Sequence, residues 1–203
     1  MQLPDVLPPR ATTEDVGGPT PPATDVEAGG PEVPPDALDA ERALIEWFRS
    51  RESALIGYSG GVDSTYLAAV ALEALGPERM VAVLGVSASV PTKQATDARE
   101  RAARLGLPLR EMPTYELNDP EYAANPANRC FHCKSELWSR LTPLARELEF
   151  AVVCDGTNAD DVREYRPGMR AASEGGVEAP LADVGLTKAA IRALSRKIGR
   201  AHV

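Results

Sequence analysis

The sequence predicts an α/β domain in which a parallel β-sheet is covered by helices on both faces. Four short apolar runs, near 53–58, 80–86, 108–112 and 150–154, alternate with stretches whose apolar residues recur at the spacing of an amphipathic helix. Such alternation is typical of strands joined by crossover helices, which makes the sheet parallel and buried. With 43% hydrophobic residues among 203, the chain is also long enough to bury a core of that kind.

The first 37 residues differ in composition from the rest of the chain. They hold half of its 18 prolines, seven acidic residues against a single basic one, and no aromatic residue. A segment of this kind cannot bury enough apolar surface to offset the entropy lost on ordering it. We therefore predict a disordered Pro/Gly-rich acidic tail over 1–37 and an ordered domain over 38–203, with Asp36 as the cap of its first helix.

Five helices are predicted from apolar residues that recur every three or four positions. One precedes the first strand, and one follows each of the four strands along the chain; the last begins at Thr187. The segments 114–129 and 155–185 are predicted to be irregular. The residues expected to face the core are, helix by helix, Ala40, Ala43, Leu44, Trp47 and Phe48; Leu67, Val70, Ala71 and Leu75; Ala95, Ala98, Ala102 and Leu105; Leu137, Trp138, Leu141, Leu144, Ala145 and Leu148; and Ala190, Ile191, Leu194 and Ile198.

A diglycine turn, Ser59-Gly60-Gly61-Val62-Asp63-Ser64, joins the first predicted strand to its helix. Two adjacent glycines let backbone N–H groups approach an anion with no side chain in the way, and the helix N-terminus adds positive partial charge. Ser59 and Ser64 add hydroxyl donors. A carboxylate at Asp63 suits a phosphate site if a divalent metal lies between them, or else it caps the helix. The alternative is a glycine turn that binds nothing.

The turn is not the common phosphate loop, because the pattern Gly-x-x-x-x-Gly-Lys-Ser/Thr is absent. It resembles instead the PP-loop of the ATP pyrophosphatases. Those enzymes split ATP between the α and β phosphates, adenylylate a substrate oxygen and release pyrophosphate. The resemblance implies that the turn receives the outer phosphates of ATP.

A pair of cysteines lies in Asn128-Arg129-Cys130-Phe131-His132-Cys133-Lys134, at a predicted helix start. The spacing places Cys130 and Cys133 on one side of a helix, where the helix N-terminus favours thiolates. A zinc site would need two further ligands. A metal site, a redox pair, a sulfur carrier and ordinary packing all remain open for this pair.

Small polar residues follow the fourth predicted strand in Asp155-Gly156-Thr157-Asn158-Ala159-Asp160-Asp161. The carboxyl ends of parallel strands share one edge of the sheet, so this segment is expected near the diglycine turn. Its polar groups, Asp160 among them, suit a nucleotide or Mg²⁺. A solvated turn is the alternative.

Two later segments place cations near the same edge. Arg166 and Arg170 lie in an irregular stretch, where they suit bidentate phosphate contacts or an exposed basic loop. Lys188 follows Thr187, a predicted helix cap, and so opposes the helix dipole. That placement makes sense if an anion such as pyrophosphate lies alongside; a surface lysine is the alternative.

Charge and hydropathy narrow the class of protein. The formal net charge is −8, and most of it lies in the first 37 residues, so no broad basic face for nucleic acid is expected. No apolar run approaches the roughly 20 residues that span a bilayer, and the N-terminus lacks the pattern of a secretion signal. We expect a cytoplasmic protein with neither nucleic-acid nor membrane partners, and its three cysteines predict no disulfide framework.

Taken together, the motifs resemble one family of PP-loop proteins, the LarE family. SGGVDSTYLA, NRCFHCK, DGTNADD, YRPGMRAA, APL and GLTKAAIR occur in the family's order and at similar spacing, from about residue 40 to 199. The loop is shared by many PP-loop enzymes, whereas DGTNADD with YRPGMRAA and GLTK is more specific. LarE proteins are ATP-dependent sulfur transferases that help mature the nickel-pincer nucleotide cofactor of lactate racemase.

The resemblance implies a Rossmann-like, doubly wound parallel sheet of the adenine nucleotide α-hydrolase type, with ATP and Mg²⁺ as cofactors. ATP adenylylates a carboxylate of a pyridinium dicarboxylate mononucleotide, and sulfur then replaces the adenylate. The sulfur comes from a sacrificed cysteine or from an iron–sulfur cluster, and members form homo-oligomers. The implied roles are phosphate binding by Ser59, Gly60, Gly61, Val62, Asp63 and Ser64, metal binding by Asp63, stabilisation of the departing pyrophosphate by Lys188, adenine contact by the backbone of Val86-Ser87, and nucleotide contact by Asp160 and Arg170.

The sequence departs from the family after Gly199, because it ends at Val203 before the segment that leads to the donor cysteine. We therefore expect a truncated member whose ATP site is present and whose sulfur source is open. The alternatives are another PP-loop adenylylating enzyme, such as an amidotransferase-type synthetase or a tRNA thiolase, and an ATP-binding fragment without catalysis.

Overall fold

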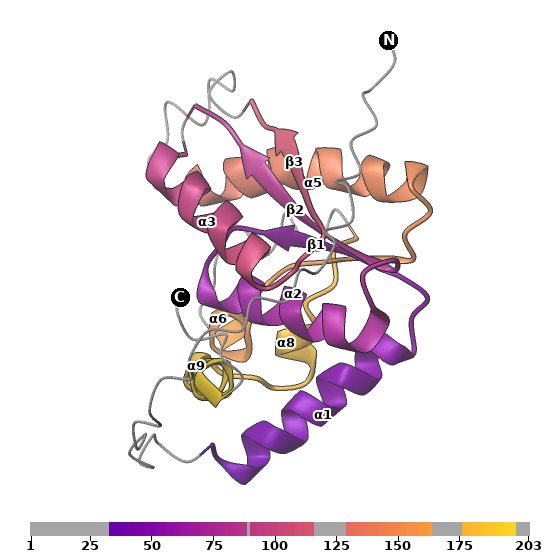
Figure 1. The fold of residues 1–203 in the computed structure, drawn as a ribbon, viewed down its shortest axis with the longest axis vertical. Coiled ribbons are helices and arrows are strands. Elements are labelled where there is room, and N and C mark those ends of the chain that lie inside the picture. Colours follow the sequence, from indigo (N-terminus) through magenta and orange to yellow (C-terminus); the bar gives the residue numbers. More distant parts are fainter. Residues whose placement is uncertain (1–32, 89, 116–128, 164–175, 198–203) are drawn as a thin grey trace, which may run out of the picture. The chain divides into compact units, whose positions relative to one another are not determined.

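A four-stranded parallel sheet forms the centre of the domain (Figure 1). The computed structural model describes residues 33–88, 90–115, 129–163 and 176–197, with all side chains among them except those of 129–135, 163 and 197. The strands run in the order β3-β2-β1-β4, and all three pairings are parallel. Their bounds are Ala54–Tyr58 for β1, Met80–Val86 for β2, Leu109–Pro113 for β3 and Val152–Cys154 for β4.

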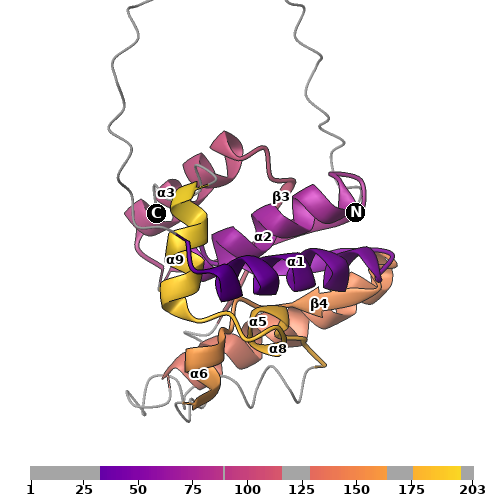
Figure 2. The ribbon, with the colours of Figure 1, turned by 90° about the horizontal axis from the view of Figure 1, so that it is seen from below.

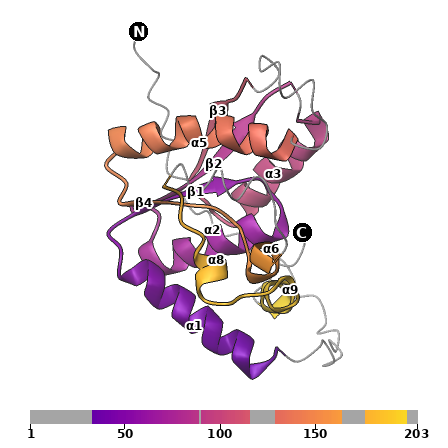
Figure 3. The same cartoon turned by 180° about the vertical axis from the view of Figure 1, so that it is seen from behind.

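The helices follow the predicted alternation. Right-handed crossovers place helices on opposite faces when the chain reverses its direction across a sheet, and this chain does so after β3. The helix α5 accordingly passes behind the strands in Figure 1 and in front of them in Figure 3. The bounds are Pro35–Arg49 for α1, Val62–Leu75 for α2, Thr92–Arg104 for α3, Arg129–Glu147 for α5, Ala159–Arg163 for α6, Pro180–Asp183 for α8 and Lys188–Lys197 for α9.

Each face of the sheet has its own core because side chains alternate along a strand. Ala54, Ile56 and Tyr58 of β1 belong to the larger cluster, which the helices α1, α2, α3, α8 and α9 cover. Leu55 points the other way, where it packs with Trp138 and Leu141 of α5. Figure 2 shows α9 beside α1 and α2, with which it is in contact. The predicted sheet, covered on both faces, is confirmed.

The ends of several elements differ from the prediction. The helix α1 begins at Pro35, because a proline with its fixed φ starts a helix readily, and Asp36 lies in the first turn without capping it. Leu148 lies after the end of α5 and is 39% exposed, since the chain turns away at Glu149 with a positive φ. The segment predicted to be irregular contains α6 and α8.

Some predictions fall on residues outside the described ranges. These are residues 1–32 of the disordered tail predicted over 1–37, the inward-facing Ile198 and most of the irregular segment 114–129. Among the described residues, no helix has the length and apolar character needed to cross a membrane.

Candidate functional site

The diglycine turn lies at the carboxyl end of β1 and leads directly into α2. Its hydroxyl groups bond mainly within the turn. The Ser64 hydroxyl accepts from the backbone N–H of Ser59 at 3.2 Å and donates to the carbonyl of Gly61 at 3.2 Å. The Ser59 hydroxyl accepts from the N–H of Gly61 at 3.3 Å and lies 3.1 Å from the Ser64 hydroxyl. The two serines therefore fix the shape of the turn.

Gly60 is held tightly against α3. Its φ is +76°, and a Cβ placed on it would lie 2.6 Å from the Cβ of Ala98. Arg101, one turn further along α3, donates a hydrogen bond to the carbonyl of Gly60. Tyr58 also anchors this point, since its hydroxyl donates to the carbonyl of Ala98 at 3.0 Å. Only glycine fits both the backbone conformation and the space at position 60.

The segment after β4 approaches the turn from the other side. The Asp155 carboxylate accepts from the N–H of Thr157 at 2.9 Å and from its hydroxyl at 2.8 Å, which closes a tight turn. Gly156, the residue after Asp155, packs against the diglycine turn. A Cβ there would lie 2.9 Å from the backbone nitrogen of Ser64, so the two segments are in direct backbone contact. The strand order places β4 next to β1, and this contact is its consequence.

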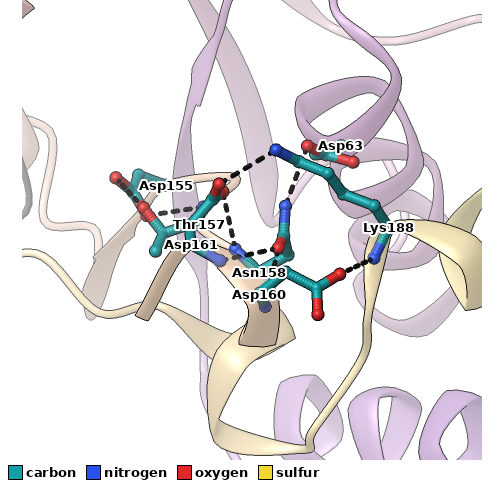
Figure 4. A network of polar contacts seen from close by, with 7 residues as sticks. All are labelled: Asp63, Asp155, Thr157, Asn158, Asp160, Asp161 and Lys188. Atoms are coloured by element: carbon teal, nitrogen blue, oxygen red, sulfur yellow. Dashed lines mark hydrogen bonds and ion pairs between the residues drawn. The ribbon is translucent and has the colours of Figure 1, made fainter. Parts of the chain in front are cut away.

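Asn158 connects the two segments (Figure 4). Its amide nitrogen donates to Oδ2 of Asp63 at 3.1 Å, and its side-chain oxygen accepts from the backbone N–H groups of Asp160 and Asp161 at 3.0 and 3.1 Å. Asp161 returns a bond, because its Oδ2 accepts from the N–H of Asn158 at 3.3 Å. Asn158 is fully buried. The reciprocal pair is a capping box that starts α6.

Lys188 meets the same segment from α9. Its backbone N–H donates to Oδ2 of Asp160 at 2.8 Å, and its Nζ lies 3.1 Å from Oδ1 of Asp161. The Thr187 hydroxyl accepts from the N–H of Ala190 at 3.2 Å, so the predicted cap of α9 is present. The two carboxylates offset the unfavourable position of a lysine at a helix N-terminus.

The carboxylate of Asp63 lies in an environment that favours its neutral form. Burial raises the pKa of Asp63 above its ordinary value, while the hydrogen bond from Asn158 lowers it. The nearby charge of Asp161 raises that pKa further, and the charges of Lys188 and Arg192 lower it. A cation close to Asp63 would therefore relieve the cost of its burial.

Three pockets meet at Ser59. One of about 160 Å³ is lined largely by apolar groups, among them Leu84, Ala95 and Leu137. A second, of about 250 Å³, lies between the segments after β1 and β4 and includes Trp138 and Asp161 in its lining. A third, of about 360 Å³, is polar and is lined by the diglycine turn with Lys93, Asp97 and Arg101 from the α3 side.

The structure thus brings several predicted site residues together and leaves others apart. The contacts described above bring the turn over 59–64, Asp160 and Lys188 close together at the carboxyl ends of β1 and β4. Ser87 follows β2 and does not line the three pockets. Arg170 and the side chains of Cys130 and Cys133 lie outside the described residues.

Sequence reasoning missed Arg101, and it predicted the segment of Gly156, Asn158 and Asp161 to lie near the turn without assigning a role to any of these three residues. The spacing of Asn158 and Asp161 is itself a sequence signal, since a capping residue followed three positions later by an acidic residue marks a helix start. Arg101 and Gly156 gave no local signal, because their roles come from contacts between segments distant in the chain.

Comparison with known proteins agrees with this geometry. A family model described as NAD synthase matches residues 45–128, a range that includes β1, the diglycine turn and α2. An uncharacterized protein of Synechocystis sp. is 44% identical over 156 residues, which are 77% of this chain and 58% of that protein. The pyridinium-3,5-bisthiocarboxylic acid mononucleotide synthase of Lactiplantibacillus plantarum is 29% identical over 156 residues, 77% of this chain and 56% of that protein.

The chain therefore spans less than two thirds of the length of these relatives. Among solved structures, NMN synthetase from Francisella tularensis superimposes with a TM-score of 0.63 at 18% identity, over 80% of this chain and 71% of the synthetase. At that identity the likeness concerns the fold, and it confirms the predicted Rossmann-like sheet. Residues 45–128 are thus similar to the NAD-synthase family, and the similarity to the Lactiplantibacillus synthase supports the resemblance to the LarE family.

Proposed function

We propose that this domain binds Mg·ATP at the joint edge of β1 and β4, adenylylates a carboxylate of a small nucleotide and releases pyrophosphate. The observation that carries the proposal is that the diglycine turn, through its Asp63, meets Asn158 of the segment after β4, which in turn holds Lys188. Neither segment alone offers a phosphate cradle, a carboxylate and a cation. The matched family and the Lactiplantibacillus relative support the same chemistry.

In this proposal the turn over 59–64 holds the β and γ phosphates of ATP. The glycines present backbone to the ligand without a side chain, and the N-terminus of α2 adds positive partial charge. Gly61 is exposed and so is Ser59, whereas Ser64 is buried beneath them. In this proposal Ser64 stabilises the turn from its buried side, and the exposed backbone of Ser59 and Gly61 is accessible to a phosphate.

Lys188 is the group that lowers the barrier. Cleavage between the α and β phosphates builds negative charge on the departing pyrophosphate. A preorganised donor aimed at charge that develops in the transition state is worth about 2.7–4 kcal/mol. The Nζ of Lys188 is held by Asp161, and its side chain is 37% exposed, so it can reach an anion without being drawn from a buried position.

Asp63 is the proposed ligand of Mg²⁺. The described residues contain no group of three or more His, Cys, Asp or Glu side chains that could hold a metal by itself. Mg²⁺ fits Asp63 nonetheless, because it keeps several waters and uses one or two carboxylates together with substrate phosphates. The raised pKa of the Asp63 carboxyl, caused first by burial, marks a group that a cation would stabilise in its charged form. Bound there, the ion would supply neutralisation of phosphate charge.

The adenine is assigned to the largely apolar pocket beside Ser59. Its walls include Leu84, Gly85 and Leu137, which suit the faces of a flat base. At Gly85 the backbone of β2 packs closely against the Leu137 side chain, since a Cβ there would lie 3.1 Å from it. The contact predicted for the backbone of Ser87, two residues further on, stays a prediction.

The finer proposal concerns the acceptor and the sulfur. The name of the Lactiplantibacillus relative supports a pyridinium dicarboxylate mononucleotide as acceptor, thiolated for a nickel-pincer cofactor after the adenylate has formed. Cys154 is a poor sulfur donor in this state, because it is fully buried and burial raises its thiol pKa. The sulfur source stays open between a cysteine and an iron–sulfur cluster, and the homo-oligomer stays a prediction.

The products of ATP turnover test the proposal. The full chain is incubated with ATP, Mg²⁺ and the pyridinium dicarboxylate mononucleotide, and the nucleotides are separated by ion-exchange chromatography. We expect pyrophosphate in an amount equal to the acyl-adenylate formed, and AMP in the same amount once water has hydrolysed that adenylate. The analogue with a methylene group between the α and β phosphates should bind without giving pyrophosphate. Formation of ADP and orthophosphate would overturn the assignment.

A second candidate is an amide-forming synthetase, which the match to the NAD synthase model favours. It would form the same kind of adenylate but would use ammonia to displace AMP. Supplying ammonium with deamido-NAD⁺ in place of the pyridinium mononucleotide separates the two. AMP formation that depends on deamido-NAD⁺ and ammonium would support the synthetase and replace the sulfur-transfer proposal.

A further inference from the structure

The Asn158 side chain hydrogen-bonds to both segments of the site, the diglycine turn after β1 and the segment after β4 (Figure 4). It reaches Asp63 at the start of α2 through its amide nitrogen. Through its oxygen it caps α6, the helix whose Asp160 and Asp161 hold Lys188. The Asn158 side chain itself is fully buried, whereas its partners Asp63 and Asp160 are half-buried.

The orientation of the Asn158 amide is fixed by its surroundings. Two backbone N–H groups point at one end of the amide, and only an oxygen can accept both. The nitrogen must then face the Asp63 carboxylate, which can only accept when it is ionised. The donor to Asp63 therefore follows from the backbone of α6 and not from a choice between two equivalent rotamers.

Capping alone does not explain this donor. Asp and Ser cap helices about as well as Asn, and Thr somewhat less well, since a cap needs only an acceptor. Asn adds a donor on the same side chain, and here that donor is used on Asp63. The amide thus has a second function, which is to hold the carboxylate.

We propose that Asn158 is a positioning residue that holds the Asp63 carboxylate in place for Mg·ATP and sets α6 so that Asp160 and Asp161 hold Lys188. The inference rests on the proposed function, because it assigns Asp63 and Lys188 the roles given above. It adds that one amide, that of Asn158, positions both the Asp63 carboxylate and the start of α6. Loss of the donor should then affect metal-dependent binding specifically.

Two variants separate the donor from the cap. Asn158→Thr keeps a neutral capping acceptor and removes the amide donor. Asn158→Asp keeps the cap and the shape, removes the donor and brings a second carboxyl group against Asp63. The full chain of each is titrated with ATP by calorimetry, once with Mg²⁺ and once with EDTA, and its thermal unfolding is recorded.

The expected result is a graded loss of Mg·ATP affinity. Since hydrogen bonds to charged groups are among the stronger ones, Asn158→Thr should weaken Mg·ATP binding about 10-fold and Asn158→Asp more. In EDTA, Asn158→Thr should bind ATP within about twofold of the unaltered chain, because the donor acts on the metal's carboxylate. Ala145→Gly, a change in the buried face of α5, serves as a control for a loss of stability far from the site.

Each outcome decides a separate point. If the unaltered chain binds no Mg·ATP, the proposed function falls and this inference falls with it. If it binds and both variants bind equally well, the donor does not position Asp63 and the inference alone is wrong. If Asn158→Thr loses the same affinity with Mg²⁺ and in EDTA, its role is structural, and the inference is wrong as well.

Discussion

The segments after β1 and β4 meet at one edge of the sheet, but they are built in different ways. The diglycine turn is held largely by bonds within itself, through the hydroxyls of Ser59 and Ser64. The segment after β4 reaches outward, to α2 through Asn158 and to α9 through Asp160 and Asp161. The first segment supplies a surface for the ligand, and the second assembles charged groups around it.

This difference decides what a substitution can do. A change in the turn should alter nucleotide affinity locally. A change in the second segment should disturb groups on other helices, because its side chains set Asp63 and Lys188. In this account nucleotide binding depends on the backbone conformation of the turn after β1 and on the side-chain positions that the segment after β4 fixes.

The largest effect is expected at the charged groups that the second segment holds. Lys188→Ala should lower pyrophosphate release about 100-fold or more, since it removes the cation that faces the leaving group. Arg196→Ala removes an exposed cation from the same helix and should leave turnover within about twofold, because exposed charges contribute little. Steady-state assays of pyrophosphate release measure both. An equal loss of pyrophosphate release in the two variants would mean that the net charge of the helix matters and the position of the Lys188 ammonium group does not.

The turn should respond through its backbone. Gly60→Ala places a Cβ at 2.6 Å from that of Ala98 and keeps a φ of +76°, so we expect the turn to shift. Nucleotide affinity should fall about 10-fold for a distortion of this size. Gly106→Ala has a φ of +65° and nothing within 4 Å, which makes it a control for backbone strain alone. Calorimetric titration with Mg·ATP compares them, and similar affinities would contradict the role of Gly60.

The contact between the two segments can be tested through Gly156. A Cβ there would lie 2.9 Å from the nitrogen of Ser64, and backbone cannot move aside easily. Gly156→Ala should lower the free energy of unfolding by about 1–3 kcal/mol. Gly85→Ala meets the end of a leucine side chain at 3.1 Å, which can rotate, and should cost less. Urea unfolding of both variants gives the comparison; the reverse order would contradict the proposed backbone contact.

The smallest effect is expected at a pair that touches neither segment. The bidentate bond from Arg99 lowers the pKa of Glu111, on a surface where both side chains are well exposed. Because the folded pKa is lowered, the pair's stabilisation is present above the unfolded pKa of the glutamate and is lost as the pH falls through the lowered value. Glu111→Gln should reduce the melting temperature slightly at neutral pH and not at acid pH. A large change at neutral pH would contradict the view that exposed pairs contribute little.

The same comparison explains what the sequence could predict. The turn was found because its signal lies in six consecutive residues, and the strands because their apolar runs are short and bounded. The role of Asn158 was missed because its partner Asp63 lies 95 positions away, so only the fold brings them together. The predictions of an Asp36 cap for α1 and of a buried Leu148 were wrong for a local reason, since the position of a helix end depends on one or two residues.

Hydrogen–deuterium exchange with and without Mg·ATP tests the central claim most directly, because it reads both segments in the unaltered chain at once. If the carboxyl ends of β1 and β4 form one nucleotide site, the amides of 59–64 and of 155–161 gain protection together, at the same nucleotide concentration. Protection confined to one of these segments, or to neither, would contradict the account.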